Sequence, residues 1–447
     1  MRRWALALLL MAAACRREPV PPPARPADCN AAISVDVLHH SVELTLEPES
    51  GSLRGTGALK VRVPAAARDL ALDAHSLRVT HAATGAQPLS LQQADGRVCL
   101  ALPQPVAAGA TLELQLAWQS LGQAKALHFA PDQIWAGYDA AAWMPTHMHS
   151  AQRATLELRL RTPRSWKAIG PGRAQPSMAR AAGEHAFILD RPAPPFLFAF
   201  AAGNFAEAEL AVAGKTLRAL GPAGADLASV LMLTRPMLEF LERRTGHPLP
   251  APVYTQVFVA GDAAQEAAGF ALIGAAELEN VRKTPEEDWV FSHELAHQWF
   301  GWLVPCTDFN DFWLNEGFAT FITGVYKEQR WVPAAHAGEL QRWRERSSKV
   351  HDTGRDTPIA RPQPAPRVDE ANLPPRGVTY ARGALALHRL RSELGEATFW
   401  LGIQRYVQDR AGKGARSDDL RRALEAASGK DLRPWFERFV YSSATDL

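Results

Sequence analysis

His293, Glu294 and His297 form an H-E-x-x-H pattern, which combines two metal-binding side chains with a carboxylate. On a helix, positions i and i+4 lie on the same face, so both imidazoles can bind one metal ion. A catalytic metal site of this kind has three protein ligands and one open position. Glu316 can supply the third ligand, and Glu294 is the natural base for a water molecule at the open position. Two histidines and a carboxylate suit zinc, so we expect one zinc ion per chain.

Two helices must position these side chains. Residues 284–287 (Thr-Pro-Glu-Glu) have the capping pattern of a helix start, and the run that follows contains no helix breaker before Gly301. A second helical pattern covers residues 311–330. A short connection between the two helices can bring Glu316 back over the histidines.

The segments HELAHQWFG (293–301) and WLNEGFATF (313–321) resemble, in sequence and in spacing, the aminopeptidase N family of zinc metallopeptidases. The resemblance implies peptide substrates, zinc bound by the two histidines and Glu316, and water activation by Glu294. Tyr380 opens the segment Tyr-Ala-Arg-Gly-Ala, which resembles the family's Tyr-x-Lys-Gly-Ala. This match implies that Tyr380 stabilises the oxygen that becomes negative when the substrate amide is attacked.

The family's exopeptidase signature, Gly-x-Met-Glu-Asn, has no full counterpart in this chain. In the family, its glutamate binds the free amino group of the substrate. Alignment on the ALI segment (271–273) makes QEAAG (265–269) the counterpart and puts Ala268 where that glutamate is expected. Glu266 and Gly269 remain as candidate substrate-binding residues. Because Glu266 is two residues out of place, we expect it to reach the amine only if a bulge redirects the strand.

Glu277, in the segment GAAEL, mimics the signature but lies only sixteen residues before His293. It is therefore too close to the metal-binding motif to be the family's amine-binding glutamate.

Three functions are compatible with the sequence. The first is a zinc aminopeptidase, and the second is a zinc peptidase that needs no free amino terminus, because Ala268 replaces the amine-binding glutamate. The third is a catalytically silent, zinc-containing binding or scaffold protein of the cell envelope. Glu294 argues against the third function, because a silent zinc site does not need it.

The chain has 447 residues, 47% of them hydrophobic, which is enough for two domains. Short alternating segments between turn-rich stretches predict an N-terminal antiparallel β-sandwich over residues 33–205. Helical patterns dominate residues 206–447, including an amphipathic helix at 227–246 that ends at Gly246. We therefore expect an α+β protein in which the sandwich precedes a mainly helical zinc domain. The resemblance implies that this second domain is thermolysin-like and that the C-terminal helical domain common in the family is absent.

Residues 1–14 have the charged start, apolar centre and small residues of a signal peptide. Cleavage would expose Cys15, as in a bacterial lipoprotein, and residues 15–32 read as a Pro-rich tether. These features predict an exported protein of the bacterial cell envelope, periplasmic and attached to the membrane by lipid on Cys15. The alternative is a simply secreted protein in which Cys15 is incidental. A bridge between Cys29 and Cys99 would suit that compartment. The formal net charge is only +2, so the composition offers no electrostatic case for binding nucleic acid.

Overall fold

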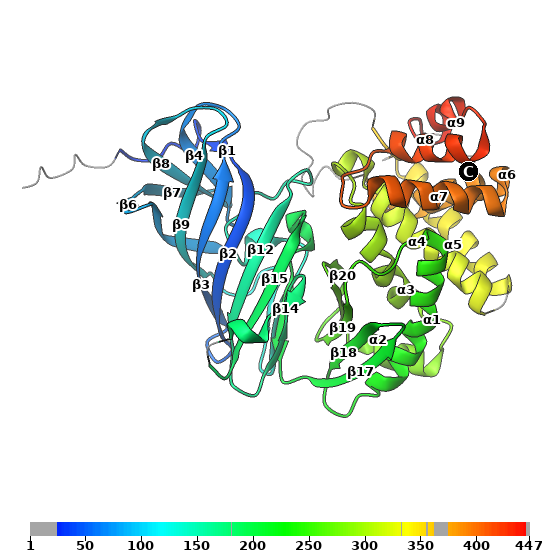
Figure 1. The fold of residues 1–447 in the computed structure, drawn as a ribbon, viewed down its shortest axis with the longest axis horizontal. Helices are drawn as coiled ribbons and strands as arrows, with labels where there is room; N and C mark the ends of the chain where they lie inside the picture. Colours follow the sequence, from blue (N-terminus) through cyan, green and yellow to red (C-terminus); the bar gives the residue numbers. More distant parts are fainter. Residues whose placement is uncertain (1–24, 180, 332, 355, 362–373, 444–447) are drawn as a thin grey trace, which may run out of the picture.

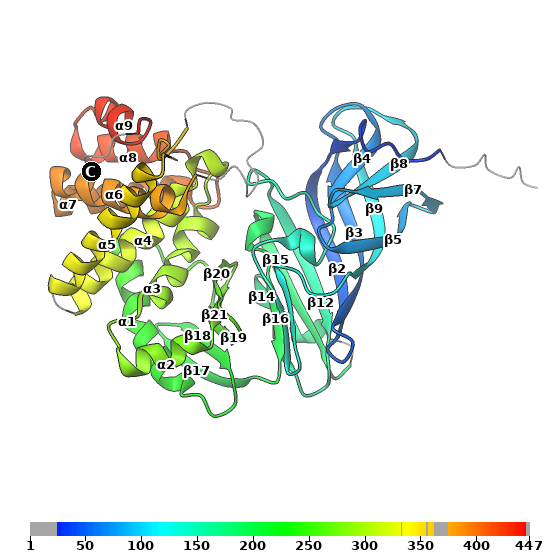
Figure 2. The same ribbon diagram turned by 180° about the vertical axis from the view of Figure 1, so that it is seen from behind.

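The computed structural model describes residues 25–443 except 180, 332, 355 and 362–373. The predicted signal peptide and Cys15 lie outside the described residues, and so does most of the predicted tether. A sheet-rich N-terminal half lies beside a mainly helical C-terminal half (Figures 1 and 2). The chain thus has the α+β organisation that the sequence predicts. None of the helices in the described part combines the length and the apolar character that a membrane span requires.

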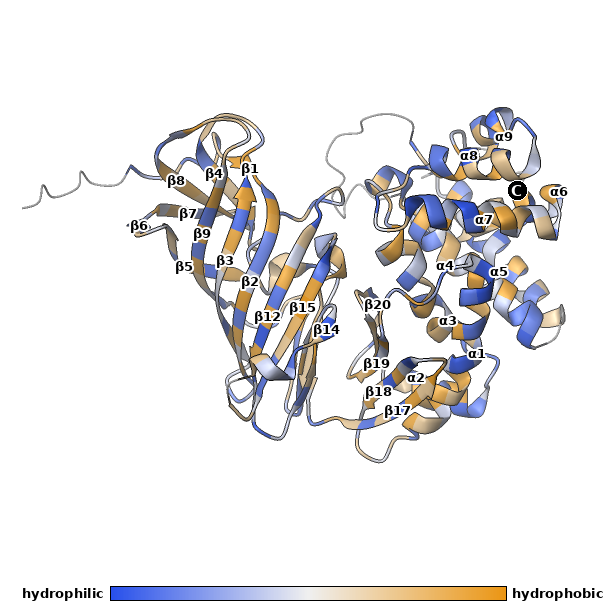
Figure 3. Ribbon diagram, in the orientation of Figure 1, coloured by the Kyte–Doolittle hydropathy of each residue, from blue (hydrophilic) through white to orange (hydrophobic). Residues whose placement is uncertain are grey.

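An eight-stranded sheet dominates the N-terminal half of the described chain. Its strands, in spatial order, are β14 (Arg173–Ala174), β15 (Glu184–Ala193), β12 (Ala154–Arg161), β2 (Asp36–Glu47), β3 (Ser52–Arg62), β9 (Thr111–Ser120), β5 (Leu77–Thr84) and β6 (Gln87–Pro88). Hydrophobic and hydrophilic residues alternate along the long strands (Figure 3), so that one face packs into the core. The predicted antiparallel pairing holds for most neighbours in this sheet, but β2 and β12 pair in parallel.

Two four-stranded sheets complete the described part of this half. One contains β1 (Ile33–Ser34), β4 (Ala67–Asp73), β8 (Arg97–Val106) and β7 (Ser90–Ala94), and β1 and β4 are parallel. The other contains β10 (Leu127–Ala130), β11 (Gln133–Ala136), β16 (Phe200–Gly203) and β13 (Lys167–Ile169). A disulfide joins Cys29 to Cys99 on β8 and holds the start of the described chain against this half.

The C-terminal half starts with a five-stranded mixed sheet in the described residues. Its spatial order is β17 (Ala206–Val212), β18 (Lys215–Gly221), β19 (Val253–Val259), β21 (Phe270–Gly274) and β20 (Ala264–Ala267), which leaves β20 at one edge. The helices are α1 (Leu227–Thr245), α2 (Ala276–Lys283), α3 (Trp289–Ala296), α4 (Trp313–Arg330), α5 (Pro333–Asp352), α6 (Gly383–Leu394), α7 (Glu396–Arg410), α8 (Ser417–Ser428) and α9 (Arg433–Phe439). As predicted, α1 ends at Gly246, whose φ of 67° suits glycine at a helix C-terminus.

Candidate metal and catalytic site

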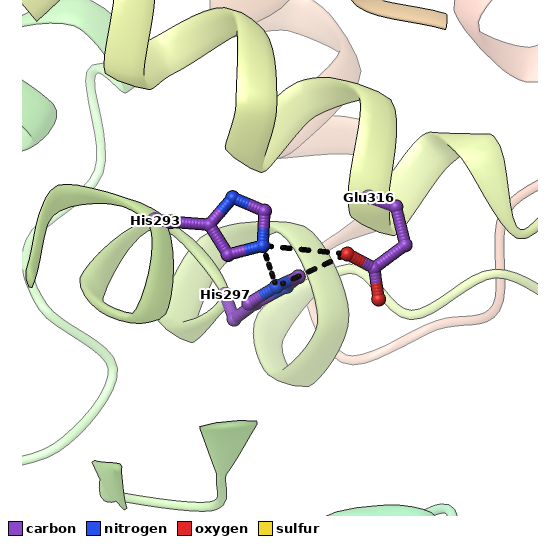
Figure 4. A group of neighbouring side chains, drawn as sticks. All are labelled: His293, His297 and Glu316. Carbon is purple, nitrogen blue, oxygen red and sulfur yellow. Dashed lines mark hydrogen bonds and ion pairs between the residues drawn. The ribbon is translucent and has the colours of Figure 1, made fainter. Parts of the chain in front are cut away.

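Two consecutive helices bring the three predicted metal ligands together. His293 lies on α3, and His297 lies where α3 passes into a short π-helix (Gln298–Leu303). Glu316 lies in the first turn of α4. The Nε2 atoms of the two histidines are 3.2 Å apart, and Glu316 Oε2 is 3.4 Å from the first and 3.5 Å from the second (Figure 4).

This arrangement of donor atoms fits a zinc ion. Zinc bonds of about 2.0–2.2 Å in a tetrahedron require donor atoms about 3.3–3.6 Å apart, which is close to the observed triangle. The ring of His297 is oriented by a 3.0 Å hydrogen bond between Nδ1 and the carbonyl of Phe300, so its Nε2 can present a lone pair to the metal. Glu316 Oε2 is buried and has no hydrogen-bond partner among the described residues, as expected of a metal ligand.

Close contact between glycines positions the second metal helix. A Cβ atom on Gly317 would lie 3.1 Å from backbone atoms of Gly383 and 3.2 Å from the carbonyl oxygen of Thr379. Glycine at position 317 therefore lets α4 pack directly on the segment that carries Tyr380. The ring of Tyr380 stacks on that of His293, with centroids 5.9 Å apart and an angle of 8° between the planes. The predicted phenol thus lies beside the metal ligands.

Two further carboxylates lie beside the metal-binding group. Glu266 and Glu294 each have an oxygen within 4.8 Å of the other and of a ring nitrogen of His297. Burial raises the pKa of the Glu294 carboxyl well above its usual value, and the neighbouring Glu266 and Glu316 raise it further. Burial also raises the pKa of Glu266, to about 7. A divalent cation at the three ligands would lower both pKa values, because it favours the charged form of each acid.

Glu266 reaches the site from a regular strand. It lies on β20, which pairs with β21 without a register shift, so the expected bulge is not needed. Its side chain lines the central cavity, and its Oε1 atom is buried without a hydrogen-bond partner among the described residues. Residues two apart on a regular strand point to the same side, so the expectation that Glu266 needs a bulge was wrong.

Ala268 and Gly269 are not among the residues that line this cavity. The backbone of Ala268 is bound to the N-terminal half: its N–H donates to Leu197 and its carbonyl accepts from Gly172. The N–H of Gly269 donates to the side chain of Gln298 at 3.1 Å. The structure therefore keeps Glu266 at the candidate site and uses the two residues after β20 for packing.

The start of the first metal helix differs from the prediction. Thr284 ends α2, and the N–H of Glu287 donates to its carbonyl in a turn, so α3 begins only at Trp289. Residues 284–287 do have the residue types that are typical of a helix start. This pattern does not start a helix because Thr284 is already the C-cap of the preceding one.

The metal ligands line a cavity of about 1000 Å³, at the upper end of the range for ligand sites. The N-terminal half contributes to its wall, including Trp135 and Tyr138. On the helical side, Trp289 and one face of α5 line it. Sequence reasoning missed all of these residues, because no motif marks them and only the tertiary fold brings them to the site.

Residues 231–439 match the model of the peptidase family M1 domain. This segment contains the metal ligands, Glu294, Glu266 and Tyr380. Residues 231–439 form a peptidase family M1 domain. The predicted relationship to the aminopeptidase N family is thereby confirmed.

Two aminopeptidases are similar in sequence to part of this chain. The chain is 29% identical over 234 residues to aminopeptidase N of Streptomyces lividans, covering 50% of this chain and 27% of that protein. It is 31% identical over 223 residues to mitochondrial aminopeptidase 2 of Saccharomyces cerevisiae, covering 45% of this chain and 22% of that protein. The chain therefore spans about a quarter of the length of these relatives.

Solved structures share the fold of both halves. The crystal structure of an M1 zinc metallopeptidase from Deinococcus radiodurans has a TM-score of 0.72 with 24% sequence identity, over 92% of this chain and 94% of that one. A mutant of that enzyme bound to a Tyr-Ser-Ala substrate gives the same TM-score with 23% identity, over 92% and 95% of the two chains. The M1 domain and the sheets before it thus form a known two-part architecture.

Proposed function

We propose that this protein is a zinc-dependent aminopeptidase that acts on short peptides. The observation that carries the proposal is the donor triangle of His293, His297 and Glu316, with the Glu294 carboxylate beside it. A zinc site without turnover needs the triangle but has no use for a buried carboxylate next to the open metal position.

The bound zinc ion and two side chains divide the chemistry in this proposal. When bound, zinc would act as a Lewis acid that polarises the substrate carbonyl and makes water more acidic. Glu294 takes the proton of the attacking water and later delivers it to the leaving amine. Tyr380 donates its hydroxyl proton in a hydrogen bond to the carbonyl oxygen as negative charge builds up there.

In this proposal, the carboxylate of Glu266 binds the free amino group of the substrate. Glu266 lines the cavity close to Glu294 and His297, and its Oε1 is buried without a hydrogen-bond partner among the described residues. Its Oε2 accepts a hydrogen bond from Gln265 at 2.8 Å, so a substrate ammonium is a good partner for the remaining oxygen. This role supports an exopeptidase and disfavours the peptidase that needs no free amino terminus. The tripeptide substrate of the Deinococcus radiodurans enzyme agrees with short peptides as the substrate class.

The test compares the purified chain with its Glu294→Gln variant on aminoacyl reporter amides, each with a free and an N-acetylated amino group. We expect zinc in both proteins, hydrolysis of the free-amine substrates by the wild type, and a loss of about 10²–10⁴-fold in kcat for the variant. Equal cleavage of the acetylated substrates would overturn the aminopeptidase in favour of the less selective peptidase. Zinc binding with no turnover of reporters or of peptides would leave the silent binding protein.

A further inference from the structure

One wall of the cavity is cationic, and the M1 signature residues do not account for it. Arg342, Arg346 and Lys349 follow one another at helical spacing on α5, and all three line the cavity. Arg376, from the residue just before the π-helix Gly377–Arg382, lines it as well. The wall therefore draws its charge from two elements that are separate in sequence.

Among the described residues, three of these four cations form no ion pair, although Arg376 is close enough to Glu266 to lower the pKa of that carboxyl. Arg342 is paired with Glu339, which also binds Lys327 at 2.9 Å. For Arg346, Lys349 and Arg376, by contrast, the described part of the chain provides no carboxylate within ion-pair distance. Like charges held on one wall repel each other, and an anion at the wall would relieve that repulsion.

A close backbone contact fixes this convergence. A Cβ atom on Gly377 would lie 2.5 Å from the carbonyl oxygen of Arg346, so only glycine lets the two segments approach this closely. The contact holds Arg376 beside Arg346. The guanidinium of Arg376 also lies 5.7 Å from the centre of the Tyr380 ring, which stacks on His293. The cationic wall therefore begins next to the metal ligands and continues along α5.

The cavity is thus lined by groups of both charges. Glu266 supplies a buried carboxylate suited to an ammonium group, whereas Arg346, Lys349 and Arg376 supply cations suited to a carboxylate. A short peptide carries both groups. We propose that this wall binds a carboxylate of the bound peptide, so that the enzyme prefers short peptides in which a free carboxylate can reach the wall. This inference rests on the proposed aminopeptidase function.

The carboxylate can come from the C-terminus of the peptide or from an acidic side chain, and two substrate pairs distinguish these sources. Ala-Ala-Ala is compared with its C-terminal amide, and Ala-Glu-amide with Ala-Gln-amide. In the wild-type protein, we expect kcat/KM to be about tenfold higher for the member with the additional carboxylate in at least one pair. The preference should shrink as salt is added, because the wall is open to solvent.

The double variant Arg346→Gln/Lys349→Gln removes two of the four positive charges of the wall. Arg344→Gln is the matched control, because Arg344 is exposed on the same helix and does not line the cavity. The double variant should reduce the preference to about twofold or less, and the control should keep it. An equal rate for both members of each pair in the wild type, or an unchanged preference in the double variant, would overturn the inference.

A binding experiment separates this inference from the proposed function. The zinc-loaded Glu294→Gln variant is titrated calorimetrically with Ala-Ala-Ala and its amide, and with Ala-Glu-amide and Ala-Gln-amide. Tighter binding of a carboxylate-bearing member, reversed by the α5 double substitution, supports the carboxylate wall even if the wild type shows no turnover. Equal affinities within both pairs contradict the wall even if the wild type hydrolyses reporter amides.

Discussion

Glu266 is the single residue on which recognition of a free amino terminus depends in the proposed function. Glu266→Gln keeps the shape of the side chain but removes its charge. We expect kcat/KM for free-amine substrates to fall by about 10–100-fold, mainly through KM, because a charge-assisted hydrogen bond is lost. Hydrolysis of N-acetylated substrates should change little. Steady-state kinetics on paired free and acetylated substrates measure both effects.

Glu277→Gln is the matched control for this residue, because Glu277 mimics the family signature but does not line the cavity. It should behave like the wild type. If Glu266→Gln also retains full activity on free-amine substrates, another group must bind the amine.

The metal ligands could be predicted from sequence because their spacing is a property of single helices and of one short connection. Glu266 and the α5 cations could not, since both depend on packing between segments that are distant in sequence. The close contact of Gly377 with Arg346, for example, leaves no trace in the local pattern. Charged residues along α5 look like the solvated face of a helix until the cavity beside them is known.

At the scale of elements, the start of α3 carries a buried acid that makes stability depend on pH. Asp288 is fully buried, and burial raises the pKa of its carboxyl to about 6, although Trp331 donates a hydrogen bond to it at 3.1 Å. Between the unfolded pKa of 3.8 and the folded pKa of about 6, the folded state binds more protons. The free energy of unfolding should therefore fall as the pH rises through this window.

Asp288→Asn removes this titration and leaves an amide oxygen to accept the hydrogen bond from Trp331. Between pH 5 and pH 8, the variant should lose about 1 kcal/mol less stability than the wild type. Urea denaturation at both pH values, with a chelator present, excludes a contribution from pH-dependent metal binding. Parallel pH dependences for the two proteins would rule out Asp288 as the source.

Some helix and strand features were predicted correctly from the sequence, and others were not. The amphipathic pattern of α1 gave both its extent and its end at Gly246, because a long apolar face and a glycine C-cap act locally. The start of α3 was misplaced, since the capping residues before it are used by the end of α2. The parallel pairing of β2 with β12 joins strands more than a hundred residues apart, and alternation alone does not determine strand direction.

At the scale of the whole molecule, the connection between the two metal helices is docked on the N-terminal half. Arg153 donates hydrogen bonds to the carbonyls of Ser150 and Gln152 in its own half and, at 2.7 Å, to the carbonyl of Cys306 in the other. The N–H of Phe309 donates to the hydroxyl of Ser150 at 3.0 Å. The sheet-rich half thus supports the segment that leads from His297 to Glu316.

Arg153→Met should weaken both the fold and the metal site. The substitution keeps apolar length but leaves the carbonyl of Cys306 without its charged donor, which costs about 1.5–3 kcal/mol of unfolding free energy. Because the connection then holds α4 less firmly, zinc affinity should fall as well, and competition with a chromogenic chelator measures it. Arg164→Met, at an exposed position of the same half, controls for the loss of a surface charge. If Arg153→Met binds zinc as tightly as this control, the metal site does not depend on the Arg153 contact.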